Sequence, residues 1–165
     1  QKDFKEAVKW FRKAAEQWDV DAQFALGFMY ANGIGVPEND EEAVNWYRKA
    51  AEQGLVGAQY NLGQMYYKGE GAPKDFKEAV KWYRKAAEQG DADAQNNLGV
   101  MHYFGEGVPQ DKVTTYAWYN IAAANGHAGA KKSKGLLAKE MTADQIAKAE
   151  TLVKEMLKKN PKLLK

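Results

Sequence analysis

Few side chains in this sequence could act as a nucleophile, a general base or a metal ligand. Ser133 is the only serine, and the Ser-x-x-Lys arrangement that would activate it is missing because position 136 is Leu136. The sequence contains no cysteine, and its two histidines, His102 and His127, do not make a metal-ligand set. We therefore expect no catalytic residue, no metal site and no cofactor, and we predict that the chain is not an enzyme.

Three Gly-x-Gly strings invite comparison with phosphate-binding loops, and they occupy residues 33–37, 69–73 and 105–109. A phosphate-binding loop follows a strand and usually carries a Lys-Ser or Lys-Thr pair. Here each string ends in proline and joins two predicted helices. We interpret the three strings as turns.

Amide and aromatic side chains offer better candidates, because they lie at matching positions of three predicted helices. An asparagine amide can donate and accept hydrogen bonds to a peptide unit at once, and aromatic side chains contribute most of the energy at many interfaces. A protein or peptide is the partner that these groups suit. The predicted binding residues are Tyr60, Asn61, Gln64, Tyr67, Lys68, Asn97, Val100, Tyr103, Phe104 and Phe28.

These positions are related by a repeat of 36 residues. The string DFKEAVKWFRKAAEQ, which starts at Asp3, recurs from Asp75 with Tyr83 in place of Phe11. Three further markers recur at the same 36-residue spacing: a Leu-Gly pair, the Gly-x-Gly-x-Pro string and a tryptophan followed by an aromatic residue. Those tryptophans are Trp10, Trp46, Trp82 and Trp118. Because these independent markers all repeat with one common spacing, they indicate a tandem array of repeats.

Each unit of the array is predicted to be a pair of helices. Apolar residues from 79 to 87 recur at helical spacing, and Gly54, Gly90 and Gly126 stand where left-handed C-caps would end such helices. No segment alternates with period two long enough for a strand. Short helices are marginal alone, so the buried alanines and aromatics of neighbouring helices must supply the stability.

Composition is that of a soluble folded chain, with 45% hydrophobic and 28% charged residues and no apolar run of membrane-spanning length. The net charge of +2 gives no argument for nucleic acid. Residues 131–165 hold 10 Lys/Arg against 4 Asp/Glu. That basic segment is either a contact for acidic partners or a solvated helix face.

The order A-x-x-x-L-G-x-x-Y-x-x-G-x-G, then P-x-D-x-x-x-A-x-x-W-Y-x-x-A-A-x-x-G, resembles the Sel-one-like repeat (SLR) family, which is related to tetratricopeptide repeats. The resemblance covers roughly residues 3–130 and suggests a bacterial source. It implies an all-α fold: a right-handed α-solenoid of antiparallel helix pairs with a C-terminal capping helix. Residues 1–165 would form one repeat domain, made of a second helix at 3–17, complete repeats at 20–53, 56–89 and 92–125, a degenerate repeat with cap at 128–159, and a tail at 160–165.

Two segments depart from the family pattern. Between residues 128 and 159 the glycine-rich loop is replaced, and Thr142 with Gln145 forms a predicted capping box before an amphipathic helix. Trp18 stands where the other units have glycine. Either the first turn is built differently, or Trp18 packs on a repeat that precedes the sequence.

The resemblance also implies a function. Similar proteins act mainly as adaptors that hold peptides or proteins on a concave face, and bacterial ones are often exported, so the periplasm or secretion is favoured over the cytoplasm. Asn61 and Asn97 stand at the repeat position where related tetratricopeptide grooves carry an asparagine that contacts the backbone of a bound peptide. Cysteine-rich relatives have been suggested to act on β-lactams, but this chain lacks their cysteines.

Several alternatives stay open at this stage. Asn61 and Asn97 could instead bond across neighbouring helices as struts, and Tyr103 and Phe104 could belong to the core. The chain could be a structural spacer within a larger protein, or, as a distant alternative, a β-lactam hydrolase. We expect a monomer.

Overall fold

The computed structural model describes residues 2–165, and the side chains of residues 3–165. Within this range all regular structure is helical, which confirms the predicted fold class. The elements are α1 (Lys2–Glu16), α2 (Val20–Asn32), α3 (Asp40–Glu52), α4 (Val56–Lys68), α5 (Phe76–Ala87), α6 (Ala92–Phe104), α7 (Lys112–Ala124), α8 (Ala128–Ala138), α9 (Ala143–Lys159) and the short 3₁₀ helix η1 (Pro161–Leu163).

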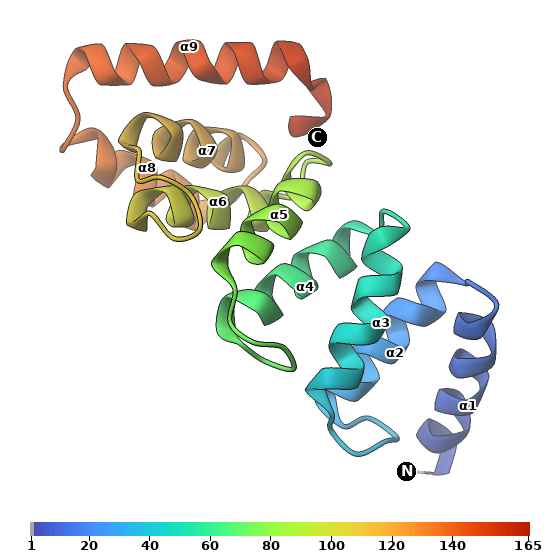
Figure 1. The fold of residues 1–165 in the computed structure, drawn as a ribbon. Coiled ribbons are helices and arrows are strands. Elements are labelled where there is room, and N and C mark those ends of the chain that lie inside the picture. The colour runs from blue at the N-terminus through green and yellow to red at the C-terminus, as the bar shows by residue number, and fades with distance from the viewer. Residues whose placement is uncertain (1) are drawn as a thin grey trace. The chain divides into compact units, whose positions relative to one another are not determined.

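The chain forms two compact units, residues 1–75 and residues 76–165, here called the N-unit and the C-unit. Within the N-unit, α1, α2, α3 and α4 pack successively on one another (Figure 1). Within the C-unit, α5, α6, α7 and α8 do the same, and α9 packs on α7. Each unit is therefore built from consecutive antiparallel helix pairs.

Short polar and glycine caps set the ends of these helices. The side chains of Asp19 and Asp91 each accept a hydrogen bond of 2.8 Å from a backbone N–H in the first turn of α2 and α6. Gly33, Gly69 and Gly105 end α2, α4 and α6 in the left-handed conformation. The Gly-x-Gly strings are thus inter-helix turns, as predicted.

The second glycine of each string allows a close contact between backbones. A Cβ atom at Gly107 would lie 2.5 Å from the carbonyl oxygen of Phe76, at the start of α5. In the N-unit, a Cβ atom at Gly35 would lie equally close to the carbonyl oxygen of Phe4. Each loop therefore rests on the first turn of an earlier helix, and only glycine leaves room for that contact.

Alanines, leucines and aromatic side chains form the core of each unit, as the repeat markers predicted. Leu26 and Leu62 in the N-unit and Leu98 in the C-unit are fully buried. The Ala-Ala pairs are also buried, for example at Ala50 and Ala86. Small side chains at these positions let neighbouring helices approach closely.

A row of buried glutamines was not predicted. Gln23, Gln59 and Gln95 are at most 3% exposed, and each side-chain amide donates a 3.1 Å hydrogen bond to a carbonyl near the end of the preceding helix. Carbonyls in the last turn of a helix lack partners within it, so these amides satisfy buried acceptors. The 36-residue spacing of the three Ala-Gln pairs was the available signal.

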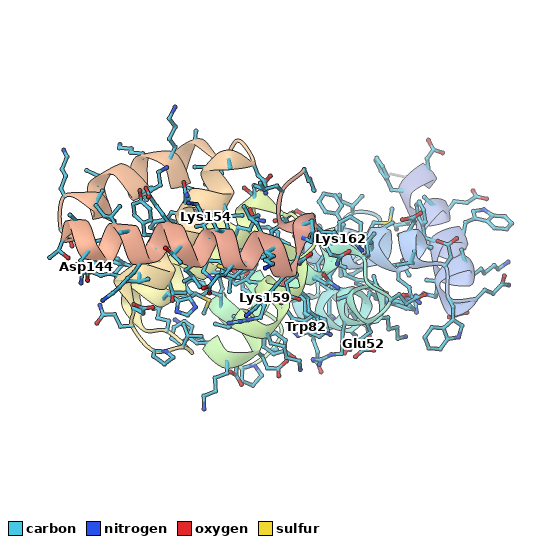
Figure 2. All side chains as sticks on the ribbon, turned by 90° about the horizontal axis from the view of Figure 1, so that it is seen from above. Glu52, Trp82, Asp144, Lys154, Lys159 and Lys162 are labelled. Atoms are coloured by element: carbon cyan, nitrogen blue, oxygen red, sulfur yellow. The ribbon has the colours of Figure 1, made fainter. Side chains whose placement is uncertain are left out.

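The C-terminal capping helix is present. Thr142 and Gln145 form the predicted capping box at the start of α9. Ala149 and Val153 are buried on its inner side. Figure 2 shows the outer side of α9, from Asp144 in its first turn to Lys159 at its end, with Lys154 between them.

The first turn is not built differently from the others, so that alternative is wrong. Trp18 has φ = 66°, in the left-handed region that Gly54, Gly90 and Gly126 occupy at the corresponding positions. Its side chain is 71% exposed. A bulky residue here carries a backbone strain that glycine avoids.

Candidate functional site

All ten predicted binding residues lie on the first helix of a helix pair. The N-unit carries six of them, Phe28 on α2 and five on α4, namely Tyr60, Asn61, Gln64, Tyr67 and Lys68. The C-unit carries Asn97, Val100, Tyr103 and Phe104 on α6. Phe28, Lys68 and Phe104 are exposed, and the others are partly buried.

Asn61 is engaged with its own unit. Its side chain lies beside the hydroxyl of Tyr47 on α3. Burial raises the pKa of the Tyr47 hydroxyl, and the nearby polar group of Asn61 offsets part of that rise. The Tyr47 ring lies 5.6 Å from that of Phe24, centroid to centroid. Asn61 on α4 therefore faces α3, and its amide has capacity for further hydrogen bonds.

The other polar groups of α4 also have partners nearby. The amide of Gln64 donates a 2.7 Å hydrogen bond to the hydroxyl of Tyr60, one turn earlier. Lys74 lies 5.7 Å from the centre of the Tyr67 ring, and Lys68 lies 3.6 Å from a carboxylate oxygen of Glu70. The exposed side of α4 therefore carries polar side chains that already contact one another, with the rings of Tyr60 and Tyr67 among them.

The C-unit has a hollow beside α6, here called the inner cavity. It has a volume of about 250 Å³ and lies between α6, α7 and α8. It is lined by Tyr103, Phe104, Tyr119, Ser133, Leu136, Leu137 and Glu140. Two of the predicted residues, Tyr103 and Phe104, thus meet at one cavity.

Apolar side chains at this cavity are unusually accessible. Phe104 is 63% exposed and Leu136 is 54% exposed. The Phe104 ring stands edge-on to that of Tyr103, with centroids 5.0 Å apart. Tyr103 itself packs on the core cluster of the C-unit, which also includes Tyr119 and Leu137. Tyr103 therefore belongs partly to the core, and Phe104 to the surface.

Sequence reasoning missed Leu136 and Glu140, which lie in the degenerate segment after residue 128. The available signal was the Leu136-Leu137 pair, of which Leu137 is buried and Leu136 is not. The carboxylate of Glu140 lies 3.2 Å from the ammonium group of Lys112 on α7. This ion pair marks the polar edge of the cavity.

Both histidines have partners within the C-unit. His102 is buried at the repeat position of Tyr30 and Tyr66, and one of its ring nitrogens, Nδ1, lies 3.3 Å from the carbonyl oxygen of Pro109. His127 caps α8, because its Nδ1 accepts a 2.8 Å hydrogen bond from the backbone N–H of Ala130. Across the described residues, no group of three or more His, Asp or Glu side chains could hold a metal ion.

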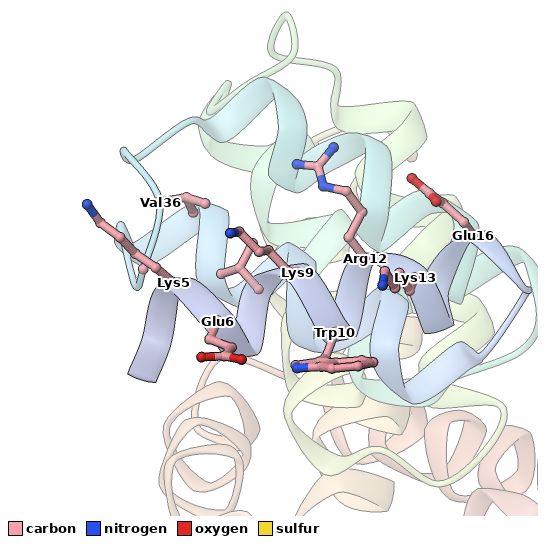
Figure 3. A pocket seen from close by; sticks show the side chains of 10 residues that line it. Lys5, Glu6, Lys9, Trp10, Arg12, Lys13, Glu16 and Val36 are labelled. Carbon is pink, nitrogen blue, oxygen red and sulfur yellow. The ribbon is translucent and has the colours of Figure 1, made fainter. Parts of the chain in front are cut away.

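A second hollow lies beside α1 in the N-unit and has a volume of about 850 Å³ (Figure 3). Charged side chains such as Lys9, Arg12 and Glu16 line it together with Trp10. Trp10 is 64% exposed, whereas Trp46, at the corresponding repeat position, is 6% exposed. On α3 the surface around Trp46 is therefore covered, whereas the corresponding surface of α1 around Trp10 is open and forms this hollow.

Consecutive helix pairs, glycine turns and buried alanine seams define a helical-repeat protein, a class of interaction scaffold. The sequence profile of the Sel1 repeat matches residues 1–17, 20–55, 56–91 and 92–127. The chain belongs to the Sel1 repeat family.

Solved bacterial structures share this fold. A protective antigen of uropathogenic Escherichia coli strains that displays an SLR fold is 33% identical, with a TM-score of 0.71 over 95% of this chain and 42% of that one. A Sel1 repeat protein from Oxalobacter formigenes is 41% identical, with a TM-score of 0.75 over 82% of this chain and 54% of that one. This chain thus spans about half the length of these two proteins.

A third similar structure is Helicobacter pylori cysteine rich protein B. It is 25% identical, with a TM-score of 0.62 over 79% of this chain and 94% of that one. A comparison with curated proteins found no match. Among the described helices, none has both the length and the apolar character needed to cross a lipid bilayer.

Proposed function

We propose that the chain binds a protein or peptide through the first helices of its repeats, with an apolar side chain of the partner seated in the inner cavity. The observation that carries this proposal is the pair of exposed apolar residues, Phe104 and Leu136, at the rim of that cavity. A soluble protein gains nothing from leaving two large apolar side chains exposed at one hollow, and such places commonly serve as binding sites.

The residues that line the inner cavity indicate which chemical groups of a partner would fit it. Rings from Tyr103, Phe104 and Tyr119 and the side chain of Leu136 favour an aliphatic or aromatic anchor. The Glu140 carboxylate at the edge favours a basic or hydrogen-bond-donating group next to that anchor. On the same helix as Phe104, Asn97 is partly exposed and suits a peptide unit of the partner.

The proposal also holds that the chain is a binding scaffold and not an enzyme. Ser133 lines the inner cavity without a histidine or lysine in the same lining, and the one carboxylate in the lining, Glu140, is ion-paired with Lys112 at 3.2 Å. Activation of a serine needs an adjacent general base within hydrogen-bond reach. The geometry of this cavity therefore supports binding of an anchor side chain and gives no support to hydrolysis.

A phage-displayed library of linear peptides tests this function. Peptides selected on the wild-type chain are remeasured by fluorescence anisotropy on Phe104→Ser and Leu136→Ser, with Phe11→Ser on α1 as control. We expect at least a ten-fold loss of affinity for the first two variants and none for the control, with unchanged melting of Phe104→Ser and Leu136→Ser. Failure to select any peptide, or equal binding to all variants, would favour a structural spacer and contradict the proposal.

A further inference from the structure

The segment that follows α9 turns back onto the loops of the C-unit. Residues 160–165 lie beside the loop after α5 and the loop after α7 (Figure 1). Within this segment Leu163 is 3% exposed, whereas the next residue, Leu164, is 39% exposed. A single leucine is therefore inserted into the unit, and its neighbour is left outside.

The backbone of the segment is held by two side-chain amides. The carbonyl oxygen of Leu163 accepts hydrogen bonds from Gln95 Nε2 at 2.8 Å and from Asn125 Nδ2 at 2.7 Å. The backbone N–H of Lys165 donates to Asn125 Oδ1 at 3.0 Å. Asn125 thus binds a C=O and an N–H of one short stretch, as a neighbouring peptide unit would.

Two further contacts fix the approach of the segment. The side-chain amide of Asn160 donates a 2.8 Å hydrogen bond to the carbonyl oxygen of Glu88, just after α5. Gly90 lies directly beneath the segment, since a Cβ atom there would stand 2.8 Å from the carbonyl oxygen of Lys162. The corresponding Gly126 has no atom within 4 Å of its Cβ position.

The amide pair belongs to the repeat and does not depend on the segment. In the N-unit, the amide of Gln53 donates to Gln23 Oε1 at 2.8 Å and to the carbonyl oxygen of Trp18 at 3.2 Å. In the C-unit, Asn125 donates to Gln95 Oε1 at 2.9 Å in the same way. The donors are therefore positioned by the repeat itself, and such preorganisation lowers the cost of binding a peptide.

We propose that Glu88, Gly90, Gln95 and Asn125, here called the amide cradle, form a binding site for a short peptide that makes one 3₁₀ turn ending at a leucine anchor, and that residues 160–165 occupy it as an intramolecular ligand. This site is formed by the loops after α5 and α7 together with Gln95 in the first turn of α6, and it is separate from the inner cavity. Tethering gives the segment a high effective concentration. It therefore blocks the cradle against peptides of the same kind from other molecules.

The first test releases the segment in the full chain. Leu163→Asp places a charge where an apolar side chain is buried, and a fluorescein-labelled peptide with the sequence of residues 159–165 is then titrated in. We expect this peptide to bind Leu163→Asp at least ten-fold more tightly than the wild-type chain, and adding Asn125→Ala to abolish the gain. Equal binding to the wild-type chain and to Leu163→Asp, or no binding to either, would overturn the proposal.

The second test does not depend on the folding of Leu163→Asp. Hydrogen exchange at the backbone N–H of Lys165 is compared between Gly90→Ala and Gly126→Ala. Both substitutions place alanine at a positive φ, at 83° and 89°, so they share the backbone strain. Only Gly90→Ala collides with the segment, so we expect at least ten-fold faster exchange in that variant alone. Equal exchange rates in the two variants would show that the segment is not seated on Gly90.

Discussion

Gly99 of α6 lies against the Tyr119 ring on α7, and a Cβ atom at Gly99 would stand 2.6 Å from both Cδ1 and Cε1 of that ring. Gly27 and Tyr47 have the same relationship in the N-unit, at 2.6 and 2.7 Å. The Leu-Gly marker is thereby explained at Gly27 and at Gly99. The leucine fills the core, and the glycine makes room for an aromatic ring of the next helix.

Gly99→Ala is expected to lower the stability of the chain. Tyr119 is buried and has little room to shift, so the added methyl group overpacks the contact and should cost about 1–3 kcal/mol. Thermal melting followed by circular dichroism measures the loss.

Gly135→Ala is the matched control for that substitution. Gly135 also lies inside a helix, α8, but it has no atom within 4 Å of its Cβ position. Alanine is the better helix former by about 1 kcal/mol, so this variant should be more stable than the wild-type chain. A gain in both variants would mean that Tyr119 yields easily and that the glycine is not required for packing.

Trp18→Gly is expected to stabilise the chain. Trp18 holds φ = 66°, which costs a bulky residue about 1–2 kcal/mol, and its exposed side chain contributes little packing. Glycine loses more backbone entropy on folding, which offsets about 0.5–1 kcal/mol of the gain. We expect a net rise of about 1 kcal/mol in the free energy of unfolding, measured by urea denaturation.

Trp18→Phe controls for the loss of the indole, because phenylalanine keeps the same backbone strain. Its stability should match that of the wild-type chain. If Trp18→Gly proved less stable than the wild-type chain, the indole would have a packing role that outweighs the strain.

Much of the fold was predictable, because the repeat itself reports which positions are shared by every unit. Leu62, Ala86 and Tyr83 are buried, as expected for residue types that recur at matching positions of the repeat. The turns were predictable from the Gly-x-Gly-x-Pro strings. The capping box of Thr142 with Gln145 is a local pattern, and it is present as predicted.

Contacts between residues that the repeat pattern does not relate to one another were not predictable in this way. The docking of Leu163 joins residue 163 to residues 95 and 125, and no periodic pattern connects these positions. Leu136 lies in a segment where the repeat pattern fails, so the Leu136-Leu137 pair alone could not show which of the two leucines is exposed beside Phe104. That Asn61 lies beside the hydroxyl of Tyr47 could not be read from the repeat pattern either.

Asn61→Ala tests whether this asparagine braces the fold, contacts a ligand or does both. If Asn61 braces the fold, a double-mutant cycle with Tyr47→Phe should give a coupling energy of about 0.5–1.5 kcal/mol in the free energy of unfolding, since each change removes one polar group of the same contact. Zero coupling would mean that this contact contributes nothing to stability.

Asn97→Ala complements that measurement on the binding side. We expect the double variant Asn61→Ala plus Asn97→Ala to bind a selected peptide at least ten-fold more weakly than the wild-type chain. Asn97→Ala alone should weaken binding without changing the melting temperature. A loss of stability equal to the loss of binding would assign both asparagines to the fold.

His102→Tyr should remove an acid-sensitive contribution to the stability of the C-unit. Burial lowers the pKa of His102, and the positive charge of Arg84 lowers it further, while the contact with the Pro109 carbonyl and the charge of Asp111 act in the opposite direction. Arg84 precedes His102 by 18 residues, as Arg12 precedes Tyr30 and Arg48 precedes Tyr66. In those two N-unit pairs the guanidinium donates a hydrogen bond to the tyrosine hydroxyl.

The direction of the pH effect follows from the lowered pKa. The unfolded chain takes up a proton at His102 near pH 6.5, before the folded chain does. The stabilisation from neutral His102 is therefore complete above that pH and is lost as the pH falls through the pKa of the folded state. Urea denaturation at pH 7.5 and 5.5 should show a smaller loss for His102→Tyr than for the wild-type chain, because tyrosine stays neutral and can accept a hydrogen bond from Arg84. An equal loss in both proteins would place the acid sensitivity in other groups.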